Sequence, residues 1–399
     1  MARGILTAAL AVAVSLAVHV ALRCPIHPLG PSPPRPAAAA ARFPPNNLLQ
    51  NMEKLGEGKL VAPEDVYVDG GGEVYTATRD GWVRRMRANG SWEEWGFVGG
   101  TGLLGVAPLA DGAMLVCDAD KGLLKVEDNG RVTLLASAVE GSTIRLGSCK
   151  FAPLLQTIHF FHRSRLADSF PGHLMLFADA AIEASDDTIY FSDASTRFNF
   201  DNWFLDFLEY RFTGRLLKYD PRTGKASVVL DNLGFANGVA LPPDESFVVV
   251  CETMLCLRVW LKGEKTGQAE IFVDNLPGNP DNIRLGSDGH FWIALLQLRS
   301  SPWFDMITRW SLTRRVIASF PALAKRTKAM VKGAMVAQVS ENGKIVRVLG
   351  DSEGKVINVV TSVTEFHGDL FFGSLATNFI GKLSLGKIPQ PQKQGAVSS

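Results

Sequence analysis

The sequence is poor in the residues that build many enzyme active sites. Among its 399 residues are 5 Cys and 7 His. No Cys-x-x-Cys pair or zinc-type His spacing occurs, and there is no His-Glu-x-x-His pair, Walker-type phosphate loop or EF-hand loop. These absences exclude the common zinc, nucleotide and EF-hand calcium sites. Chemistry must therefore come from dispersed Asp, Glu and Asn side chains.

The chain also lacks an excess of charge of either sign. It has 41 Lys and Arg against 40 Asp and Glu, a net charge of +1. A nucleic-acid groove is therefore not expected, and a small-molecule substrate must be recognised by local groups. Because 46% of the residues are hydrophobic and 20% are charged, the chain has enough apolar material for a large core.

Only one long apolar run is present, from Ile5 to Leu22, with Arg3 before it and Arg23 after it. It predicts a targeting segment over residues 1–24, either a signal peptide or an uncleaved signal anchor. Residues 25–50 are rich in Pro and Ala and predict a linker, and residues 387–399 predict a disordered tail. Such a targeting segment predicts the secretory pathway, with the endoplasmic reticulum lumen or membrane as a residence.

Two features depend on that compartment. Asn89-Gly90-Ser91 is an acceptor sequence for N-glycosylation at an expected hairpin turn. Cys251 and Cys256 could form a disulfide across a hairpin in an oxidising lumen, or remain buried free thiols. The sequence favours neither state of the two cysteines.

From residue 60 onward the sequence repeats a unit of turn, apolar strand, polar residues, glycine and second apolar strand. Examples are Glu73 to Thr76 with Gly81 to Arg84, and Ile189 to Ser192 with Gly214 to Tyr219. Six such units can be counted, and uninterrupted ones lie roughly forty residues apart, as in propeller blades of four strands. We therefore expect an all-β, six-bladed β-propeller over residues 51–386.

Two stretches interrupt the repeat. Residues 146–176 form an atypical insertion without strand alternation, which we interpret as translated intron or an error in the gene model, with a functional lid as the alternative. Residues 302–335 interleave basic and apolar residues and predict a helical excursion. This excursion could be a lid over the channel mouth or a contact with a membrane surface.

Three polar residues share one phase of the repeat, at the entry of the first strand of a blade. They are Glu64, Asn237 and Asp281. Equivalent positions of a ring converge on its axis, and carboxylate and amide oxygens are the ligands that calcium prefers. We therefore expect a Ca²⁺ site that could polarise an ester or lactone carbonyl or activate a water. The alternative is that these residues cap strands without a metal.

Several long motifs give the chain a family resemblance. Phe235 to Leu241, Leu276 to Ile283 and Phe291 to Leu295 resemble the strictosidine synthase-like family, including its plant members and the animal adipocyte plasma membrane-associated proteins. Tyr190 to Thr196 and Gly214 to Asp220 extend the match. The resemblance implies a six-bladed propeller, residence in the secretory pathway or vacuole, and distant kinship with calcium-dependent lactonases and esterases of the paraoxonase and gluconolactonase kind.

The resemblance also assigns roles to residues. It implies that Glu64, Asn237 and Asp281 are metal ligands, whereas the asparagine of relatives is replaced by Ala178, so that Asp179 is the candidate substitute ligand. The catalytic glutamate of the true synthase falls in the segment Leu295 to Leu298, where Gln297 cannot transfer a proton. We therefore expect a metal-assisted hydrolase of a small ester or lactone without strictosidine synthase activity. The alternatives are a non-catalytic propeller that binds small molecules or proteins, and an enzyme that condenses an amine with an aldehyde.

Overall fold

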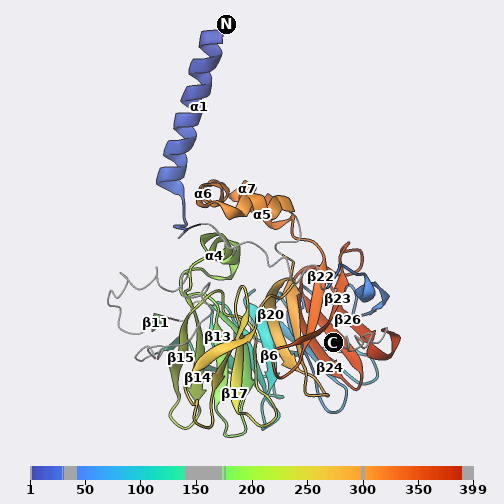
Figure 1. Cartoon of the computed structure of the whole chain (residues 1–399). Coiled ribbons are helices and arrows are strands. Elements are labelled where there is room, and N and C mark those ends of the chain that lie inside the picture. Colours follow the sequence, from blue (N-terminus) through green and yellow to red (C-terminus); the bar gives the residue numbers. More distant parts are fainter. Residues whose placement is uncertain are drawn as a thin grey trace, which may run out of the picture.

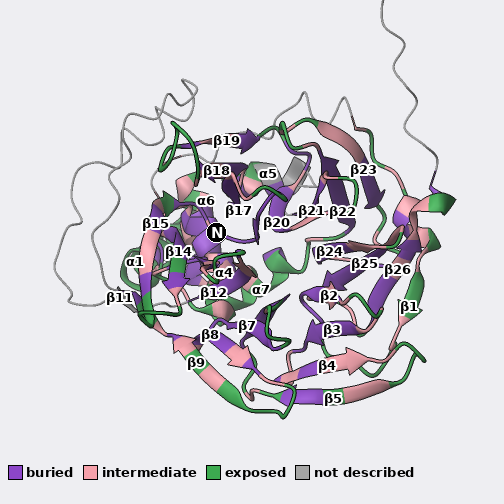
Figure 2. Ribbon diagram, turned by 90° about the horizontal axis from the view of Figure 1, so that it is seen from below, coloured by how far each residue is buried: buried purple, intermediate pink, exposed green. Residues whose placement is uncertain are grey.

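The computed structural model describes residues 2–28, 30, 43–139, 173–174, 177–297 and 302–388. Its main body consists of six four-stranded antiparallel sheets. Figure 2 shows these sheets arranged like blades around a central axis, with one strand of each sheet nearest the axis. The predicted all-β, six-bladed propeller is thus confirmed.

The first three blades follow the chain from the inner to the outer strand. Blade 1 contains β2 (Val66–Val68), β3 (Val74–Ala77), β4 (Trp82–Met86) and β5 (Trp92–Phe97). Blade 2 contains β6 (Leu103–Pro108), β7 (Met114–Asp118), β8 (Gly122–Val126) and β9 (Val132–Ala136). Blade 3 contains β12 (Ala178–Glu183), β13 (Ile189–Asp193), β14 (Gly214–Asp220) and β15 (Lys225–Leu233).

The other three blades complete the ring. Blade 4 contains β16 (Val239–Ala240), β17 (Phe247–Cys251), β18 (Cys256–Trp260) and β19 (Ala269–Val273). Blade 5 contains β20 (Asn279–Leu285), β21 (Phe291–Leu296), β22 (Ala334–Val339) and β23 (Ile345–Asp351). Blade 6 contains β24 (Val360–Phe366), β25 (Asp369–Ser374), β26 (Ile380–Ser384) and, as its outer strand, β1 (Glu53–Leu55).

Blade 6 closes the ring because it takes strands from both ends of the propeller sequence. Glu53 of β1 pairs with Lys382 of β26, and Leu55 pairs with Ile380. The outer edge of the last blade is therefore supplied by the segment that precedes the first blade. Closure of this kind leaves no unpaired end strand at which the ring could open.

The core lies between neighbouring blades rather than within one sheet. Val249 of blade 4 belongs to the same buried cluster as Ile293 and Ala337 of blade 5. The strands that line these layers are β-branched and aromatic, and β17 is buried along its whole length. Cys251 and Cys256 lie opposite each other across β17 and β18 and form a disulfide. The structure thus selects one of the two alternatives left open for them.

The helices gather at one end of the propeller (Figure 1). They are α1 (Ala2–Arg23), α4 (Trp203–Glu209), α5 (Pro302–Arg309), α6 (Ser311–Ser319) and α7 (Pro321–Lys328), with the short 3-10 turn η2 (Phe200–Asn202). Two other 3-10 turns lie elsewhere: η1 (Leu48–Asn51) contacts β23 of blade 5, and η3 (Leu385–Lys387) follows β26 of blade 6. Helix α1 is long and apolar enough to cross a membrane, as expected for a signal or anchor. His19 near its end donates a hydrogen bond to the Ser319 carbonyl (3.1 Å) and stacks on Phe320, so α1 leaves the body beside α6 and α7.

Both ends of the Pro/Ala-rich linker are packed, which the sequence did not predict. Ile26 is fully buried in a cluster with Phe204 of α4 and Phe304 of α5. At the other end, Asn46 accepts a hydrogen bond from Gly350 N and donates one to the Val348 carbonyl. Its middle part, residues 31–42, lies outside the described residues.

The structure describes the helical excursion at residues 302–335 but only a small part of the insertion at residues 146–176. Most of the insertion at residues 146–176 lies outside the described residues, as does the tail from residue 389 onward. Within the insertion, β11 (His173–Leu174) pairs with β10 (Ala138–Val139). The helical excursion is confined to α5, α6 and α7, because Ala334 and Met335 already belong to β22.

Candidate functional site

Bulges in the inner strands turn polar side chains toward the axis. The pairing of β12 with β13 is irregular between Ala178 and Ala181, and that of β20 with β21 between Pro280 and Ile283. Asp179 and Asp281 lie inside these two irregular stretches. A bulge redirects a side chain that regular pleating would place on a sheet face. The bulges therefore explain how these two inner strands direct buried carboxylates toward the axis.

Glycine lets neighbouring blades approach closely at the same level. A Cβ atom at Gly105 of β6 would lie 2.4 Å from the Asp179 carbonyl, and one at Gly238 would lie 2.4 Å from the Ile283 amide nitrogen. Only glycine allows this backbone contact. The contacts bring the inner strands of blades 2 and 3, and of blades 4 and 5, together beside the polar residues.

Glu64 is held by residues from the fifth and sixth blades. Asn282 Nδ2 donates a hydrogen bond to Glu64 Oε1 (2.9 Å), and the hydroxyls of Thr361 and Ser362 donate to the Glu64 carbonyl. The neighbouring Asp65 is paired with Arg284, which lies two residues beyond Asn282. The site is thus fixed by contacts between blades that are far apart in the sequence.

Two buried oxygens in this group have no hydrogen-bond partner among the described residues. They are Glu64 Oε2 and Asn237 Oδ1. A buried oxygen without a partner carries an uncompensated cost of about 1–3 kcal/mol. While Glu64 is ionised, both atoms are acceptors only, so a cation or a donor group is the species that would satisfy both.

Burial and mutual repulsion raise the pKa values of the three carboxylates. The pKa of Glu64 lies well above its usual range because of burial and the charges of Asp179, Asp65 and Asp281, against the opposing effect of Arg284. Burial and Asp65 raise the pKa of Asp179 to about 8. Burial and Asp179 also raise the pKa of Asp281, whereas a hydrogen bond from Asn237 lowers it. These groups are therefore close enough to repel one another.

The structure thus brings together all four residues that the sequence singled out. Glu64, Asp179, Asn237 and Asp281 are all buried and come from blades 1, 3, 4 and 5. Among the described residues, however, no three His, Cys, Asp or Glu side chains have the spacing of a metal site. The donors fit a hard cation in kind, but coordination would need the Asn237 amide oxygen and water in addition to carboxylates.

Asn237 faces a small cavity at the helical end of the axis. The cavity measures about 40 Å³, and its walls include Trp203, Phe235 and Leu296. Next to Leu296, Gln297 is buried, with Nε2 3.4 Å from the Ala334 carbonyl. The apolar wall can exclude water from a group bound beside Asn237. Gln297 offers such a bound group neither a general acid nor a general base.

Sequence reasoning missed three residues of the site. They are Asn282, which donates a hydrogen bond to Glu64, and the ion pair of Asp65 with Arg284. Two of the three are direct neighbours of predicted ligands: Asp65 follows Glu64, and Asn282 follows Asp281. The signal was present in the adjacent acidic and amide residues. Their partners could not be identified because they lie more than 200 positions away along the chain.

One further motif is present but is not a hydrolase nucleophile. Residues 350–354 read Gly-Asp-Ser-Glu-Gly, which matches the Gly-x-Ser-x-Gly pattern. A nucleophile elbow requires a helix directly after the serine, whereas here the chain continues into β24. Ser352 is exposed, and its hydroxyl donates to Asn47 Oδ1 (2.9 Å). Ser352 is therefore a structural surface residue.

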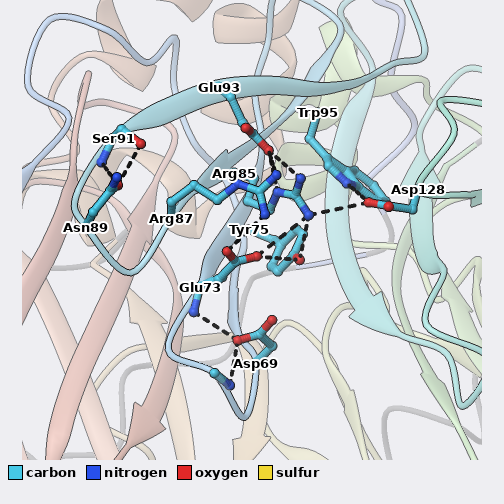
Figure 3. Close-up of polar contacts among 11 residues, drawn as sticks. Asp69, Glu73, Tyr75, Arg85, Arg87, Asn89, Ser91, Glu93, Trp95 and Asp128 are labelled. Carbon is cyan, nitrogen blue, oxygen red and sulfur yellow. Dashed lines mark hydrogen bonds and ion pairs between the residues drawn. The ribbon is translucent and has the colours of Figure 1, made fainter.

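The glycosylation acceptor lies on an exposed hairpin between β4 and β5. Asn89 Oδ1 accepts hydrogen bonds from Ser91 N (3.0 Å) and Ser91 Oγ (2.7 Å), as Figure 3 shows. Behind it, Arg85 and Trp95 reach Asp128 of the next blade. This network fixes the hairpin while leaving the Asn89 side chain exposed.

Comparison with known proteins identifies relatives of this chain. The family profile "Strictosidine synthase" matches residues 179–264, and the profile "Strictosidine synthase-like, N-terminal" matches residues 41–86. Strictosidine synthase-like 4 from Arabidopsis thaliana is 31% identical over 361 residues, covering 87% of this chain and 86% of the relative. Adipocyte plasma membrane-associated protein from Rattus norvegicus is 32% identical over 405 residues, covering 95% of this chain and 99% of the relative.

A solved structure shows the same fold at low identity. A gluconolactonase from Xanthomonas campestris aligns with a TM-score of 0.54 and 15% sequence identity, covering 90% of this chain and 98% of that one. At this level of identity the likeness concerns the fold of the two proteins.

Proposed function

Because this chain belongs to the strictosidine synthase-like family, we propose that it is a propeller of the secretory pathway that hydrolyses a small ester or lactone with the help of a bound calcium ion. The observation that carries the proposal is the pair of buried, unpartnered oxygens, Glu64 Oε2 and Asn237 Oδ1, beside mutually repelling carboxylates. The similarity of the fold to that of a gluconolactonase also supports a hydrolase.

The residues that would hold the ion are Glu64, Asn237 and Asp281, with Asp179 in place of the asparagine that Ala178 replaces. Bound there, calcium would supply an electrophile for a substrate carbonyl. The protein contributes the rest: Asn282 and Arg284 orient Glu64 and Asp65, and Trp203 and Leu296 form a wall that keeps water from the reacting group. Without the ion, Asp179 has a pKa of about 8 and can hold a proton at neutral pH, which calcium binding would displace.

Hydrolysis is tested directly with purified protein on a panel of aryl esters and lactones, after chelation and after addition of calcium. We expect turnover that requires calcium and falls by at least tenfold in Asp281→Asn. Asp288→Asn, which changes an exposed aspartate of the same blade, is the matched control and should keep full activity. Absence of hydrolysis above the spontaneous rate for every substrate would reject the hydrolase.

A second function is favoured by one specific difference. Where the family resemblance implies an asparagine ligand this chain has Ala178, and no three His, Cys, Asp or Glu side chains among the described residues have the spacing of a metal site. Both features suit a non-catalytic propeller that binds a small molecule or a protein. Binding of substrate analogues without turnover, in both the chelated and the calcium-loaded protein, is the result that would favour this function.

The third possibility, condensation of an amine with an aldehyde, is opposed by Gln297. Tryptamine and secologanin should give no strictosidine above an enzyme-free control when analysed by mass spectrometry, because the buried Gln297 amide cannot transfer the proton that the condensation needs. Product formed well above that control would contradict this expectation. Gln297→Glu alone need not create activity, since both substrates must also fit the cavity.

The location of the protein is inferred from α1. We infer that α1 inserts into the membrane of the endoplasmic reticulum as a signal or an anchor and leaves the propeller in the lumen, or in the vacuole at a later stage. The name of the rat relative, a plasma membrane-associated protein, supports a membrane-linked location. The Cys251 to Cys256 disulfide suits an oxidising lumen.

A further inference from the structure

A second, larger cavity lies beside the one at Asn237. It measures about 210 Å³ and shares Trp203 and Leu296 with the smaller cavity, so the two lie on either side of a common apolar wall. Its other walls include Phe200 and two basic residues, Arg79 and Lys328. A cavity that combines aromatic walls with two cations has the composition of a binding site for an amphipathic anion.

Both cations rest on aromatic rings. The Arg79 guanidinium carbon lies 3.6 Å from the centre of the Phe200 ring, and Lys328 Nζ lies 4.5 Å from the centre of the Trp203 ring. Arg79 Nη1 is buried without a hydrogen-bond partner. Within the described ranges, neither side chain forms an ion pair. The aromatic contacts hold the two charges in place without neutralising them.

The surroundings make these positive charges costly. Burial lowers the pKa of Arg79, although Asp201 and Asp120 act against that effect from a distance. Burial, followed by the charge of Arg79, lowers the pKa of Lys328, whereas the charge of Asp201 acts in the opposite direction. The two cations therefore repel each other in a partly desolvated space. Because Lys328 as a whole is solvent-exposed although its ammonium group is partly buried, an anion can reach the pair from solvent.

Two strained backbone positions also line this cavity. Ala62 has a φ of 45° and Val359 a φ of 51°, in the left-handed region that residues with a Cβ rarely adopt. The strain is greatest for the β-branched Val359, whose amide donates to the Gly333 carbonyl (3.0 Å). Such positions persist where surrounding contacts enforce them, and they concentrate at binding sites.

We propose that this cavity binds the carboxylate of a small amphipathic organic acid between Arg79 and Lys328, with its apolar body against Phe200 and Trp203. The planar guanidinium of Arg79 suits a carboxylate, and its unpartnered Nη1 supplies a donor. The inference rests on the proposed hydrolase in one respect only. We assume that the carboxylate belongs to the substrate of that hydrolase, and that the ester or lactone group of the same substrate would extend past the shared wall to Asn237.

Isothermal titration with 4-phenylbutyrate and its neutral amide tests the assignment. Wild-type protein should bind the acid at least tenfold more tightly than the amide. Arg79→Gln and Lys328→Gln should each weaken binding of the acid by about tenfold and leave the amide unchanged. Arg326→Gln is the matched control, because it removes an exposed charge from the same helix, α7, outside this cavity.

Two outcomes would overturn the proposal: equal affinity for acid and amide, or unchanged affinity for the acid in both variants. Phenyl phosphate that binds more than tenfold tighter than phenylbutyrate would overturn the choice of carboxylate. Since Lys328 is exposed, Lys328→Gln should fold even if Arg79→Gln does not. Titration in the presence of chelator separates this proposal from the proposed hydrolase. The protein can hydrolyse neutral esters without preferring the acid to the amide, and it can bind the acid without hydrolysing any substrate.

Discussion

At the scale of single residues, the axial oxygens decide whether the propeller binds a metal. Addition of calcium should raise the melting temperature of the wild-type protein by a few degrees relative to chelator, because a ligand that binds only the folded state stabilises it. In Asp281→Asn this gain should largely disappear, since one of the charged ligands is lost. Differential scanning calorimetry measures both effects.

Asp288→Asn provides the control for that experiment. Asp288 belongs to the exposed turn between β20 and β21 and is not among the axial residues, so its loss should leave the calcium-dependent gain intact. Identical melting curves of wild type with calcium and with chelator would reject the metal site. The unpartnered oxygens Glu64 Oε2 and Asn237 Oδ1 would then need a donor from a different ligand.

Asp206 should make the folded protein less stable as the pH rises. Burial raises its pKa from 3.8 to about 7 in the folded state, although Ser195 donates a hydrogen bond to it. Between these two values the folded protein holds a proton that the unfolded chain has released, so stability falls as the pH increases. Above about pH 7 the folded protein bears the full loss of stability that comes from a buried, ionised Asp206.

Asp206→Asn tests this dependence because asparagine can accept from Ser195 and never carries the charge. The unfolding free energy of the variant relative to wild type should rise between pH 4.5 and pH 8 by up to about 3 kcal/mol. Urea unfolding at several pH values measures the difference. A difference that stays constant over this range would show that Asp206 is not protonated in the folded protein at acidic pH.

At the scale of elements, α5, α6 and α7 form a surface that is both apolar and basic. Trp310 and Leu312 are 59% and 67% exposed, beside Arg309 and Arg315. This composition is typical of helices that lie in the interface of an anionic membrane. Their position beside α1 places them where a membrane would be if α1 spans it (Figure 1).

Replacement of Trp310 and Leu312 by serine should therefore weaken membrane binding. With a chain that lacks residues 1–23, co-sedimentation with phosphatidylserine vesicles should fall by about tenfold or more, because two exposed apolar side chains no longer enter the interface. Val132→Ser with Leu134→Ser is the matched control, since both residues are exposed apolar positions on β9 of blade 2. Equal loss in both variants would assign these helices to a lid instead.

At the scale of the whole molecule, α1 and the channel mouth lie at the same end of the propeller (Figure 1). If α1 enters the endoplasmic reticulum membrane, the propeller is luminal and the mouth faces the bilayer. Asn89 should then be glycosylated, with a mobility shift on endoglycosidase treatment that Asn89→Gln abolishes. Asn129→Gln, in the equivalent hairpin of blade 2, is the control because no acceptor sequence surrounds it.

Carbonate extraction completes the test of topology. A signal anchor keeps the protein in the membrane pellet, whereas a cleaved signal releases it, and both place Asn89 in the lumen. A chain that is unglycosylated and found in the cytosol would contradict both. The proposed substrate site would in that case open away from any membrane.

The sequence by itself determined the fold, because its evidence is local. Short β-branched and aromatic strands separated by Gly, Asp and Asn turns recur at the spacing of four-stranded blades, and each strand carries its own signal of period two. The phase of the repeat also indicated Glu64, Asn237 and Asp281 as neighbours, because equivalent positions of a ring share an axis. These inferences need only the chain order and a closed ring.

Tertiary structure alone decided how those residues are oriented and what surrounds them. The bulges at Asp179 and Asp281, the bond from Asn282 to Glu64 and the disulfide between Cys251 and Cys256 each depend on strand register or on contacts between distant blades. Arg79 and Lys328 meet only because α7 folds back over the channel mouth. Such contacts leave no periodic trace in the sequence, since their energy comes from packing between segments hundreds of residues apart.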